Sequence, residues 1–288
     1  MPELPEVEVV KQSLEKYILN KNILKIIIKN KKLRFPVPRN LSNKLSFLKI
    51  IRIKRISKYI VIEFYKEFFL LIHLGMSGTL HLIKNSNSLK NTNLSFYHSK
   101  NFPKKHNHIF FYFKNFSIIF NDPRRFGFVK LIKGKKNIHN YFIKLGPDPF
   151  GKKLNLNYIK KYFYNKKKNI KNSLIDQSFI SGIGNIYASE ILNYSRINPL
   201  KASGKITEKE ISKIILHTRN VLKYAIYKGG SSISNFQTVK GNKGSYQNEF
   251  RAYNREKEKC KNKSCRGTII KLNISNRSTY MCNICQKK

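Results

Sequence analysis

The stretch CKNKSCRGTIIKLNISNRSTYMCNIC, residues 260–285, holds every cysteine of the chain. Four residues separate Cys260 from Cys265, two separate Cys282 from Cys285, and sixteen residues rich in Thr, Ile and Tyr lie between the pairs. Two close pairs on either side of a hairpin-length segment provide tetrahedral thiolate geometry. The sequence therefore predicts a β-hairpin closed by one structural Zn²⁺, with Cys260, Cys265, Cys282 and Cys285 as ligands.

Two disulfides, or four free thiols, are the alternative for these cysteines. The first residues of the chain are acidic and include two prolines, which is not typical of a signal peptide, so we expect a cytoplasmic location. Disulfides are rare in that compartment, and metal binding is favoured. Arg266, Lys271 and Arg277 lie on the expected hairpin, which would present cations to a polyanion.

Upstream of the cysteines, between residues 150 and 230, the hydrophobic pattern is helical. Asn185 is placed as the cap of a helix over residues 186–194. The sequence TEKE at 207–210 is a capping box for a second helix, which Gly229 and Gly230 end. Residues 231–246 are rich in Ser, Gly, Asn and Lys, which indicates a loop.

The first part of the chain is predicted to be a short helix followed by strands. Pro5 suits a first helical position, and Val7, Val10, Leu14 and Ile18 recur at helical spacing. Eight apolar, β-branched runs then indicate a β-sandwich or barrel; they cover residues 23–28, 48–53, 59–64, 68–74, 79–83, 109–113, 117–120 and 128–132. Residues 85–105 are polar and without period, and a flexible insertion is expected there.

The charge of the chain points to a polyanionic partner. Of its 288 residues, 58 are Lys or Arg and 15 are Asp or Glu, which gives a formal net charge of +43. This balance favours nucleic acid first and an anionic membrane surface second. Lys, Asn and Ile are abundant everywhere and have AT-rich codons, so part of the charge reflects composition bias. No apolar run of about 18 residues occurs, and no membrane span is expected.

Three of the 15 acidic residues, Glu3, Glu6 and Glu8, lie in the first eight positions. Carboxylates there complement a helix N-terminus, which is the simpler explanation. The other explanation concerns Pro2, which becomes a free secondary amine if Met1 is removed. An α-amino group has a pKa near ~8, well below that of Lys, so more of it is nucleophilic at neutral pH. Attack on a sugar C1′ would give an iminium ion, and Glu3 could move the protons.

Several motifs of the chain resemble those of bacterial formamidopyrimidine-DNA glycosylases, which excise 8-oxoguanine and ring-opened purines. The resemblance covers nearly the whole chain and rests most on MPELPEVE at 1–8 and GNIYA at 184–188. Further matches follow in the family's order: SKY at 57–59, HLGMSG at 73–78, KHNH at 105–108, NDPRRFG at 121–127, LGPDP at 145–149 and the terminal cysteines with Arg277.

The resemblance implies a role for each matching residue. Pro2 would be the Schiff-base nucleophile, Glu3 the general acid/base, Glu6 a supporting carboxylate and Lys58 the lysine near the lesion phosphate. Arg277 would act in the second elimination. The implied DNA-binding residues are Met76, Arg124 and Phe126, which fill the space left by the extruded nucleotide, with His106, Lys166 and the phosphate clamp Asn185.

The residues themselves permit plainer explanations for several of these positions. Met76 and Phe126 could be sandwich core residues, although Phe126 follows two arginines and precedes a glycine, as in an exposed turn. Lys58 could belong to a solvated basic face, and His106 could be a solvated loop histidine. The turn before Asn185 could be an ordinary capped helix rather than a phosphate site.

The fold implied is α+β and multidomain. A β-sandwich with a leading helix is expected over residues 1–132, a linker over 133–150, a helix-two-turn-helix domain over 151–240 and a zinc-finger β-hairpin over 255–288. The expected partner is double-stranded damaged DNA, bound by a monomer in a cleft between the domains, with no membrane and no small-molecule cofactor.

Three departures from the family pattern bear on this interpretation. The first cysteine pair has four intervening residues where the family usually has two, Val9 replaces the usual Thr, and the loop at 239–246 matches the lesion-capping segment imperfectly. One alternative function is an endonuclease VIII-like glycosylase for oxidised pyrimidines, although Leu4 favours the purine branch. Another is a non-catalytic zinc protein that binds nucleic acid, and a membrane-surface binder is a distant third.

Overall fold

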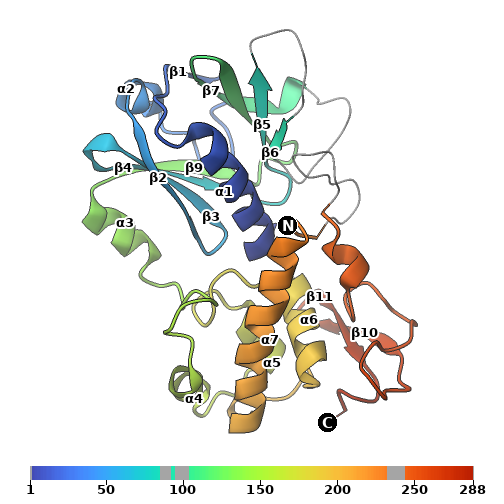
Figure 1. The fold of residues 1–288 in the computed structure, drawn as a ribbon. Coiled ribbons are helices and arrows are strands. Elements are labelled where there is room, and N and C mark those ends of the chain that lie inside the picture. The colour runs from blue at the N-terminus through green and yellow to red at the C-terminus, as the bar shows by residue number, and fades with distance from the viewer. Residues whose placement is uncertain (1, 85–91, 95–103, 232–243, 288) are drawn as a thin grey trace. The chain divides into compact units, whose positions relative to one another are not determined.

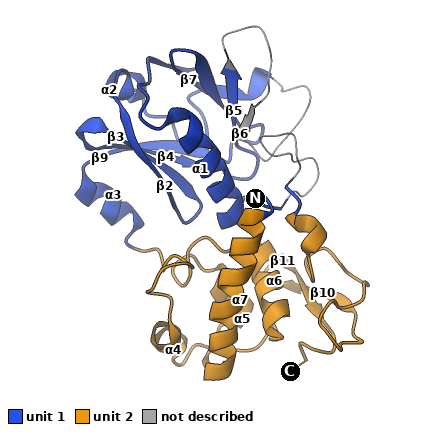
Figure 2. Cartoon of the chain, in the orientation of Figure 1, with its two compact units in different colours: residues 1–143, 228–245 blue, residues 144–227, 246–288 orange. Residues whose placement is uncertain are grey.

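The structure is a computed structural model that describes residues 2–84, 92–94, 104–231 and 244–287. The chain forms two compact units (Figure 2). Unit 1 comprises residues 1–143 and 228–245, and unit 2 comprises residues 144–227 and 246–288.

Unit 1 begins with the helix α1 (Leu4–Ile18), as the sequence predicts. Pro5 lies in the first helical turn, where its missing N–H costs no hydrogen bond. Val7, Val10, Leu14 and Ile18 are 2 % exposed or less, so the predicted apolar stripe is the buried face.

Two antiparallel sheets follow α1 (Figure 1). One has the strand order β2-β3-β4-β9, with bounds Ile50–Ile56, Tyr59–Phe64, Phe68–His73 and Phe128–Lys133. The other has the order β1-β7-β8-β5-β6, with bounds Lys25–Ile28, Asn107–Tyr112, Phe116–Asn121, Thr79–Lys84 and Thr92–Leu94. All eight predicted strands are present, and one core cluster joins both sheets to α1. The predicted β-sandwich with a leading helix is confirmed.

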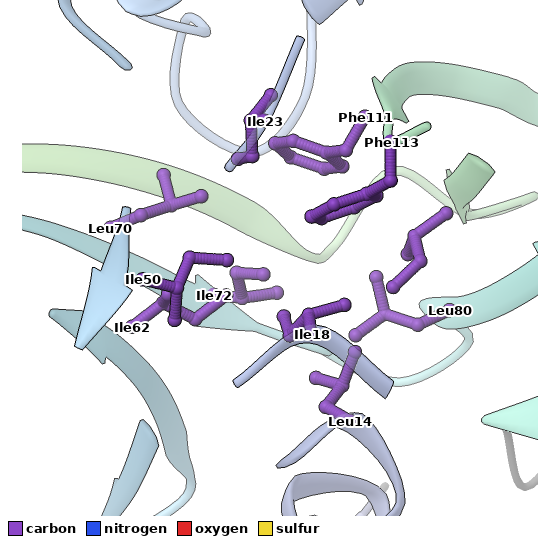
Figure 3. A pocket seen from close by; sticks show the side chains of 11 residues that line it. Leu14, Ile18, Ile23, Ile50, Ile62, Leu70, Ile72, Leu80, Phe111 and Phe113 are labelled. Carbon is purple, nitrogen blue, oxygen red and sulfur yellow. The ribbon is translucent and has the colours of Figure 1, made fainter. Parts of the chain in front are cut away.

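A small apolar cavity of about 10 Å³ lies in this core, lined from α1 and from both sheets (Figure 3). Leu14, Ile62, Leu80 and Phe111 are among the side chains that converge on it. A space of this size is at the lower limit for one water molecule, and its lining offers no polar partner. The cavity is therefore a packing defect of the core rather than a ligand site.

Helices cover parts of the sandwich that the sequence analysis left without structure. The short helix α2 (Leu41–Leu45) buries both of its terminal leucines. The helix α3 (Lys135–Phe142) packs Ile138, Tyr141 and Phe142 against the outer face of the first sheet. In the expected insertion, β6 pairs with β5, so that part is a strand rather than irregular chain. Residues 85–91 and 95–103 lie outside the described residues.

Unit 2 combines four helices with one hairpin. The helices are α4 (Leu156–Phe163), α5 (Ile170–Ile175), α6 (Asn185–Ser195) and α7 (Glu208–Tyr227). The hairpin consists of β10 (Ile269–Ile274) and β11 (Arg277–Cys282). The helix α6 contacts α5, α7 and β11, and most of its residues are buried. It is the central element of the unit.

Helix starts in unit 2 match the sequence with one correction. The capping box is present, because Glu210 Oε2 accepts from Thr207 N–H at 2.8 Å and Thr207 Oγ1 accepts from Glu210 N–H at 3.3 Å. The prediction that Asn185 caps α6 is wrong by one residue, since Gly184 is the N-cap and Asn185 is the first helical residue.

The two units also contain short 3-10 helices: η1 (Tyr65–Glu67), η2 (Lys104–His106), η3 (Ser203–Lys205) and η4 (Tyr246–Glu249). No helix in the described ranges is long and apolar enough to cross a membrane.

Candidate functional site

The N-terminal carboxylates form a closed hydrogen-bonded box. Pro2 is buried directly before α1, and Glu3 and Glu6 are each 3 % exposed. Glu3 is the N-cap of α1: its side chain accepts from the N–H of Glu6, and Glu6 Oε2 accepts from the N–H of Glu3 at 2.8 Å. The box fixes the backbone next to Pro2, so helix capping and a role beside Pro2 are compatible.

The second oxygen of Glu6 reaches a distant segment of the same unit. Glu6 Oε1 accepts hydrogen bonds from Ser231 N–H at 2.8 Å and from Ser231 Oγ at 2.9 Å. Gly229 and Gly230 precede Ser231 with positive φ angles of 77° and 83°, which glycine adopts without strain. The carboxylate of Glu6 thus joins the start of α1 to the chain that follows α7.

Lys58 lies in the two-residue turn between β2 and β3. It is only 7 % exposed, so the alternative of a solvated basic face is wrong for this residue. The turn is held from α1, because Arg55 Nε donates to Glu8 at 2.8 Å while Arg55 Nη1 donates to the carbonyl of Ser57 at 3.1 Å. Glu8 therefore positions Lys58 through Arg55, a role that the sequence analysis did not assign.

A neutral histidine lies in the same positive environment. Burial first, and then the charges of Lys58 and Arg34, together lower the pKa of His73 to about 4. Its Nδ1 accepts from the N–H of Gly75 at 3.1 Å, and its ring stacks on Phe128. At neutral pH the imidazole is uncharged and keeps its proton on Nε2, which can donate to an oxygen.

The loops 74–78 and 122–127 are built around the fully buried carboxylate of Asp122. Asp122 accepts from Ser77 Oγ and, at 2.7 Å, from the N–H of Gly127. Ser77 Oγ in turn accepts from the N–H of Arg124 at 3.1 Å. A Cβ added at Gly75 would lie 2.3 Å from the backbone of Phe126, so only glycine permits this approach. The two loops form one rigid support.

This support presents three of the predicted DNA-binding residues. Phe126 is 43 % exposed, so it is not a core residue. The guanidinium of Arg124 lies over its ring at 4.7 Å from the centroid, in cation–π geometry. Met76 is half-buried in the facing loop. The structure therefore brings Met76, Arg124 and Phe126 together, and neither Ser77 nor Asp122 was identified as their support.

The histidines of the KHNH motif lie beside the same support. The carbonyl of His106 accepts from the N–H of Asp122 at 3.1 Å, and the His106 side chain is half-buried. Burial, then the charge of Lys105, lowers the pKa of His106. His108 is fully buried, and its Nε2 bonds the carbonyl of Asp122 at 2.8 Å. His108 is thus structural rather than solvated, and His106 is the accessible one.

In unit 2, Arg277 lies at the turn end of the β10–β11 hairpin. The turn residues Ser275 and Asn276 have φ angles of 49° and 58°, as a tight two-residue hairpin requires. Arg277 is exposed and pairs with Ile274 at the first position of the ladder. Its guanidinium is therefore available to a ligand of unit 2.

Polar side chains from two helices hold the strand next to Arg277. Asn185 Nδ2 donates to the carbonyl of Ser278 at 2.9 Å, and the buried Lys171 Nζ donates to the same carbonyl at 3.2 Å. Lys171 Nζ also donates to Thr279 Oγ1. Asn185 thus positions the hairpin in addition to lying at the N-terminus of α6, where backbone N–H groups favour anions.

Lys166 lies in the loop between α4 and α5. It is exposed, its Nζ lies 5.4 Å from the ring centroid of Tyr162, and its carbonyl accepts from the N–H of Gly204 at 2.9 Å. The predicted site residues are thus divided between the units: Lys166, Asn185, Arg277 and the cysteines belong to unit 2, and the others to unit 1.

The four cysteines gather at the base of the hairpin. Their sulfur atoms all lie within 4.8 Å of one another, with 3.8 Å between Cys260 and Cys285 and 3.5 Å between Cys265 and Cys282. A disulfide needs about 2.05 Å, so the disulfide alternative is wrong. Thiolates about 2.3 Å from a central ion in a tetrahedron lie about 3.8 Å apart, so this cluster fits one metal ion.

Comparison with protein families finds two matching models. The formamidopyrimidine-DNA glycosylase N-terminal domain matches residues 1–129, and the formamidopyrimidine-DNA glycosylase H2TH domain matches residues 145–237. Among curated proteins, a formamidopyrimidine-DNA glycosylase of Wolbachia from Brugia malayi is 38 % identical over 99 % of this chain and all of its own length. One from Roseobacter denitrificans is 36 % identical, with both chains fully covered.

Solved structures with the same fold include complexes of Lactococcus lactis Fpg with DNA. A complex with DNA that contains an abasic site has a TM-score of 0.86 and 30 % identity, covering 99 % of this chain and 100 % of the other. A complex of a point mutant of the same enzyme with DNA that contains Fapy-dG has a TM-score of 0.87 and 30 % identity, with both chains fully covered.

Proposed function

The chain belongs to the formamidopyrimidine-DNA glycosylase family, and on that premise we propose that Pro2, freed by removal of Met1, is its nucleophile. The protein is a base-excision-repair DNA glycosylase with AP lyase activity. The observation that carries the assignment of Pro2 is the box of Glu3 and Glu6, which holds the backbone beside this residue.

The proposed reaction begins with attack of the Pro2 nitrogen on C1′ of the damaged nucleotide. The C1′–N bond breaks, and the base leaves with the electrons of that bond and the proton that the Pro2 nitrogen loses. The C1′–O4′ bond then breaks as Glu3 protonates O4′, and the opened sugar is joined to Pro2 as an iminium ion. The iminium ion accepts electrons when a C2′ proton is removed and the 3′ phosphate is expelled. A second elimination expels the 5′ phosphate, and water then releases Pro2.

Proton transfers in this sequence are assigned to Glu3, with two further side chains in support. Glu3, adjacent to Pro2 in sequence, is the general acid/base at the sugar. Glu6 keeps both oxygens bound to backbone and Ser231 donors, which suits a supporting carboxylate rather than a proton carrier. Lys58, buried in the β2–β3 turn, supplies positive charge toward the lesion phosphate.

Recognition of the damaged nucleotide requires that it leave the duplex, at a cost of a few kcal/mol. Met76, Arg124 and Phe126 offset this cost by filling the vacated space, and the rigid support around Asp122 suits that task. The charged or polar groups His106, Lys166, Asn185 and Arg277 bind the phosphate backbone, and Arg277 also takes part in the second elimination.

We assign the cysteine cluster to one Zn²⁺, held by Cys260, Cys265, Cys282 and Cys285. The ion would act as a structural cross-link that contributes folding free energy to the hairpin and takes no part in the reaction. Protein side chains position Arg277 itself, since Asn185 and Lys171 hold the strand that carries it.

The substrate class that fits best is oxidised purine, that is 8-oxoguanine and formamidopyrimidines in double-stranded DNA. The curated relatives and the Lactococcus lactis complex with Fapy-dG support this choice over the endonuclease VIII-like alternative.

We further propose that the protein is a monomer in the bacterial cytoplasm and uses no small-molecule cofactor. The domain limits of the sequence analysis, at 1–132, 133–150, 151–240 and 255–288, stay a prediction.

Borohydride trapping on two duplexes in parallel tests both the chemistry and the substrate class. An 8-oxoguanine duplex should give a covalent complex at a much higher yield than a thymine-glycol duplex. The reverse order would move the protein to the pyrimidine branch. Failure to trap either duplex, with metal bound and DNA binding intact, would favour a non-catalytic DNA-binding protein.

A further inference from the structure

Three of the four cysteine sulfurs receive a hydrogen bond from the backbone two residues further along the chain. The N–H groups of Asn262, Gly267 and Ile284 donate to Cys260, Cys265 and Cys282 at 3.5, 3.4 and 3.4 Å. Such donors stabilise the negative charge of a thiolate. The three sulfurs therefore share one local backbone geometry.

The fourth sulfur, that of Cys285, has a different donor. The N–H of Lys287, two residues further on, bonds the carbonyl of Ile284 at 3.2 Å and is therefore directed away from Cys285. Instead, the side-chain amide of Asn262 donates to Cys285 Sγ at 3.1 Å. Asn262 thus serves two thiolates, Cys260 through its backbone and Cys285 through its side chain.

Asn262 lies in the first metal-binding knuckle, residues 260–265, which has four residues between its cysteines where the family usually has two. It is 7 % exposed, whereas its neighbours Lys261, Lys263 and Ser264 are exposed. Ser264 has a φ of 60°, which turns the chain back toward Cys265. The longer knuckle can therefore direct one amide inward while its other side chains remain in solvent.

The same amide also contacts α6. Asn262 Nδ2 lies 3.2 Å from the carbonyl of Asn193 and 3.5 Å from Asn193 Oδ1. An amide nitrogen carries two hydrogens, so one can bond Cys285 while the other bonds Asn193. Asn193 Nδ2 in turn donates to Gln286 Oε1 at 2.9 Å, and that oxygen also accepts from the N–H of Cys282 at 2.9 Å. Both knuckles are thus bonded to the C-terminal half of α6.

We propose that Asn262 is a positioning residue of the metal site, which stabilises the thiolate of Cys285 and fastens the cysteine cluster to α6. This inference rests on the metal site of the proposed function. It also gives the hairpin two attachments to one helix, because Asn185 at the start of α6 bonds the carbonyl of Ser278 next to Arg277. Loss of Asn262 should loosen the metal and the hairpin together.

Metal release to a chelator tests the proposal on the full-length protein. Asn262→Ala should release Zn²⁺ about 10 to 100 times faster than the unchanged protein, the usual effect of removing a residue that orients a ligand. Asn262→Asp should be worse, because a carboxylate beside a thiolate repels it. Lys263→Ala, an exposed neighbour in the same knuckle, is the matched control and should release at the original rate. Equal rates for Asn262→Ala and the control would overturn the proposal.

A spectroscopic measurement on the unsubstituted protein covers the case in which the variants do not fold. After exchange of the metal for ¹¹³Cd, magnetisation should pass from the metal to the Asn262 side-chain amide through the N–H···S bond. The backbone N–H groups of Asn262, Gly267 and Ile284 are internal references. Coupling to these three groups without coupling to the side-chain amide would contradict the proposal. If the unsubstituted protein binds no metal, the metal site assigned to the four cysteines is itself wrong.

Discussion

Glu6 and Ser231 are separated by 225 positions in the sequence, yet Glu6 Oε1 accepts two hydrogen bonds from Ser231, at 2.8 and 2.9 Å. The other oxygen of the same carboxylate accepts from the N–H of Glu3 at 2.8 Å. One buried side chain therefore connects the backbone beside Pro2 with the segment that begins after Gly230. Changes at Glu6 should act on both.

Replacing Glu6 by Gln should destabilise unit 1 and reduce activity. The amide keeps one acceptor oxygen and turns the other position into a donor, which then faces either the Glu3 N–H or the Ser231 donors. A buried unsatisfied donor costs about 1 to 3 kcal/mol. Urea denaturation should show this loss, and borohydride trapping should fall. Glu15→Gln, in a partly exposed pair with Lys11, is the control and should change stability by less than about 0.5 kcal/mol.

Phe126→Ala should slow excision far more than it weakens binding to undamaged duplex. The exposed ring stabilises the state in which the nucleotide has left the stack, so its loss should hardly change the affinity for undamaged duplex. Single-turnover excision and binding to both duplexes measure the two effects. Phe47→Ala, at another exposed phenylalanine, should leave both unchanged. Equal losses on intact and damaged DNA, with a reduced circular dichroism signal, would assign Phe126 to folding instead.

Stability should fall as the pH is lowered from neutral toward 5, in part because of His73. Its pKa is about 4 in the folded protein, against 6.5 when unperturbed, because burial and the nearby Lys58 and Arg34 oppose its protonation. As the pH falls, the unfolded chain takes up this proton at a higher pH than the folded protein does. The stability that neutral His73 contributes is therefore complete above pH 6.5 and is lost as the pH falls toward 4. By pH 5 the loss should reach about 2 kcal/mol. The free energy of unfolding of His73→Gln, measured by urea denaturation, should depend less on pH than that of the unchanged protein. The same pH dependence in both would contradict the lowered pKa of His73.

The salt dependence of DNA binding should separate specific cations from the bulk of the +43 charge. If roughly six phosphates are neutralised, log affinity against log salt should have a slope of roughly −5. Lys166→Ala should make the slope smaller by roughly one. Lys90→Ala, at a position outside the described residues, should leave it nearly unchanged. Equal effects at both positions would mean diffuse attraction of a polycation.

Patterns that are local in the sequence predicted most of the fold. Apolar, β-branched runs identified the eight strands, and the TEKE box identified the start of α7. The helix α3 was not predicted, because its N-cap Gly134 has no side chain that could mark a helix start, and its apolar side chains pack in part on β3 and β4, which are distant in sequence. The strand β6 is only three residues long, which is too short to show a hydrophobic period in the sequence.

The site shows the same division between local and distant information. Cysteine spacing predicted the metal cluster, and family motifs pointed to Pro2. The supporting roles of Asp122 and Asn262 could not be read from the sequence, because each depends on hydrogen bonds to residues that only folding brings near. A buried polar side chain reveals its function through its partners rather than through its neighbours in the chain.

The central claim is that residue 2 forms the covalent intermediate, and the most direct measurement is peptide mapping of the borohydride-trapped complex. Intact-mass analysis should first show that Met1 is absent. The DNA adduct should then be found on the N-terminal peptide, at Pro2, and a Pro2→Gly variant that retains Met1 should give no adduct. An adduct on any lysine, or trapping by that variant at the original yield, would contradict the account.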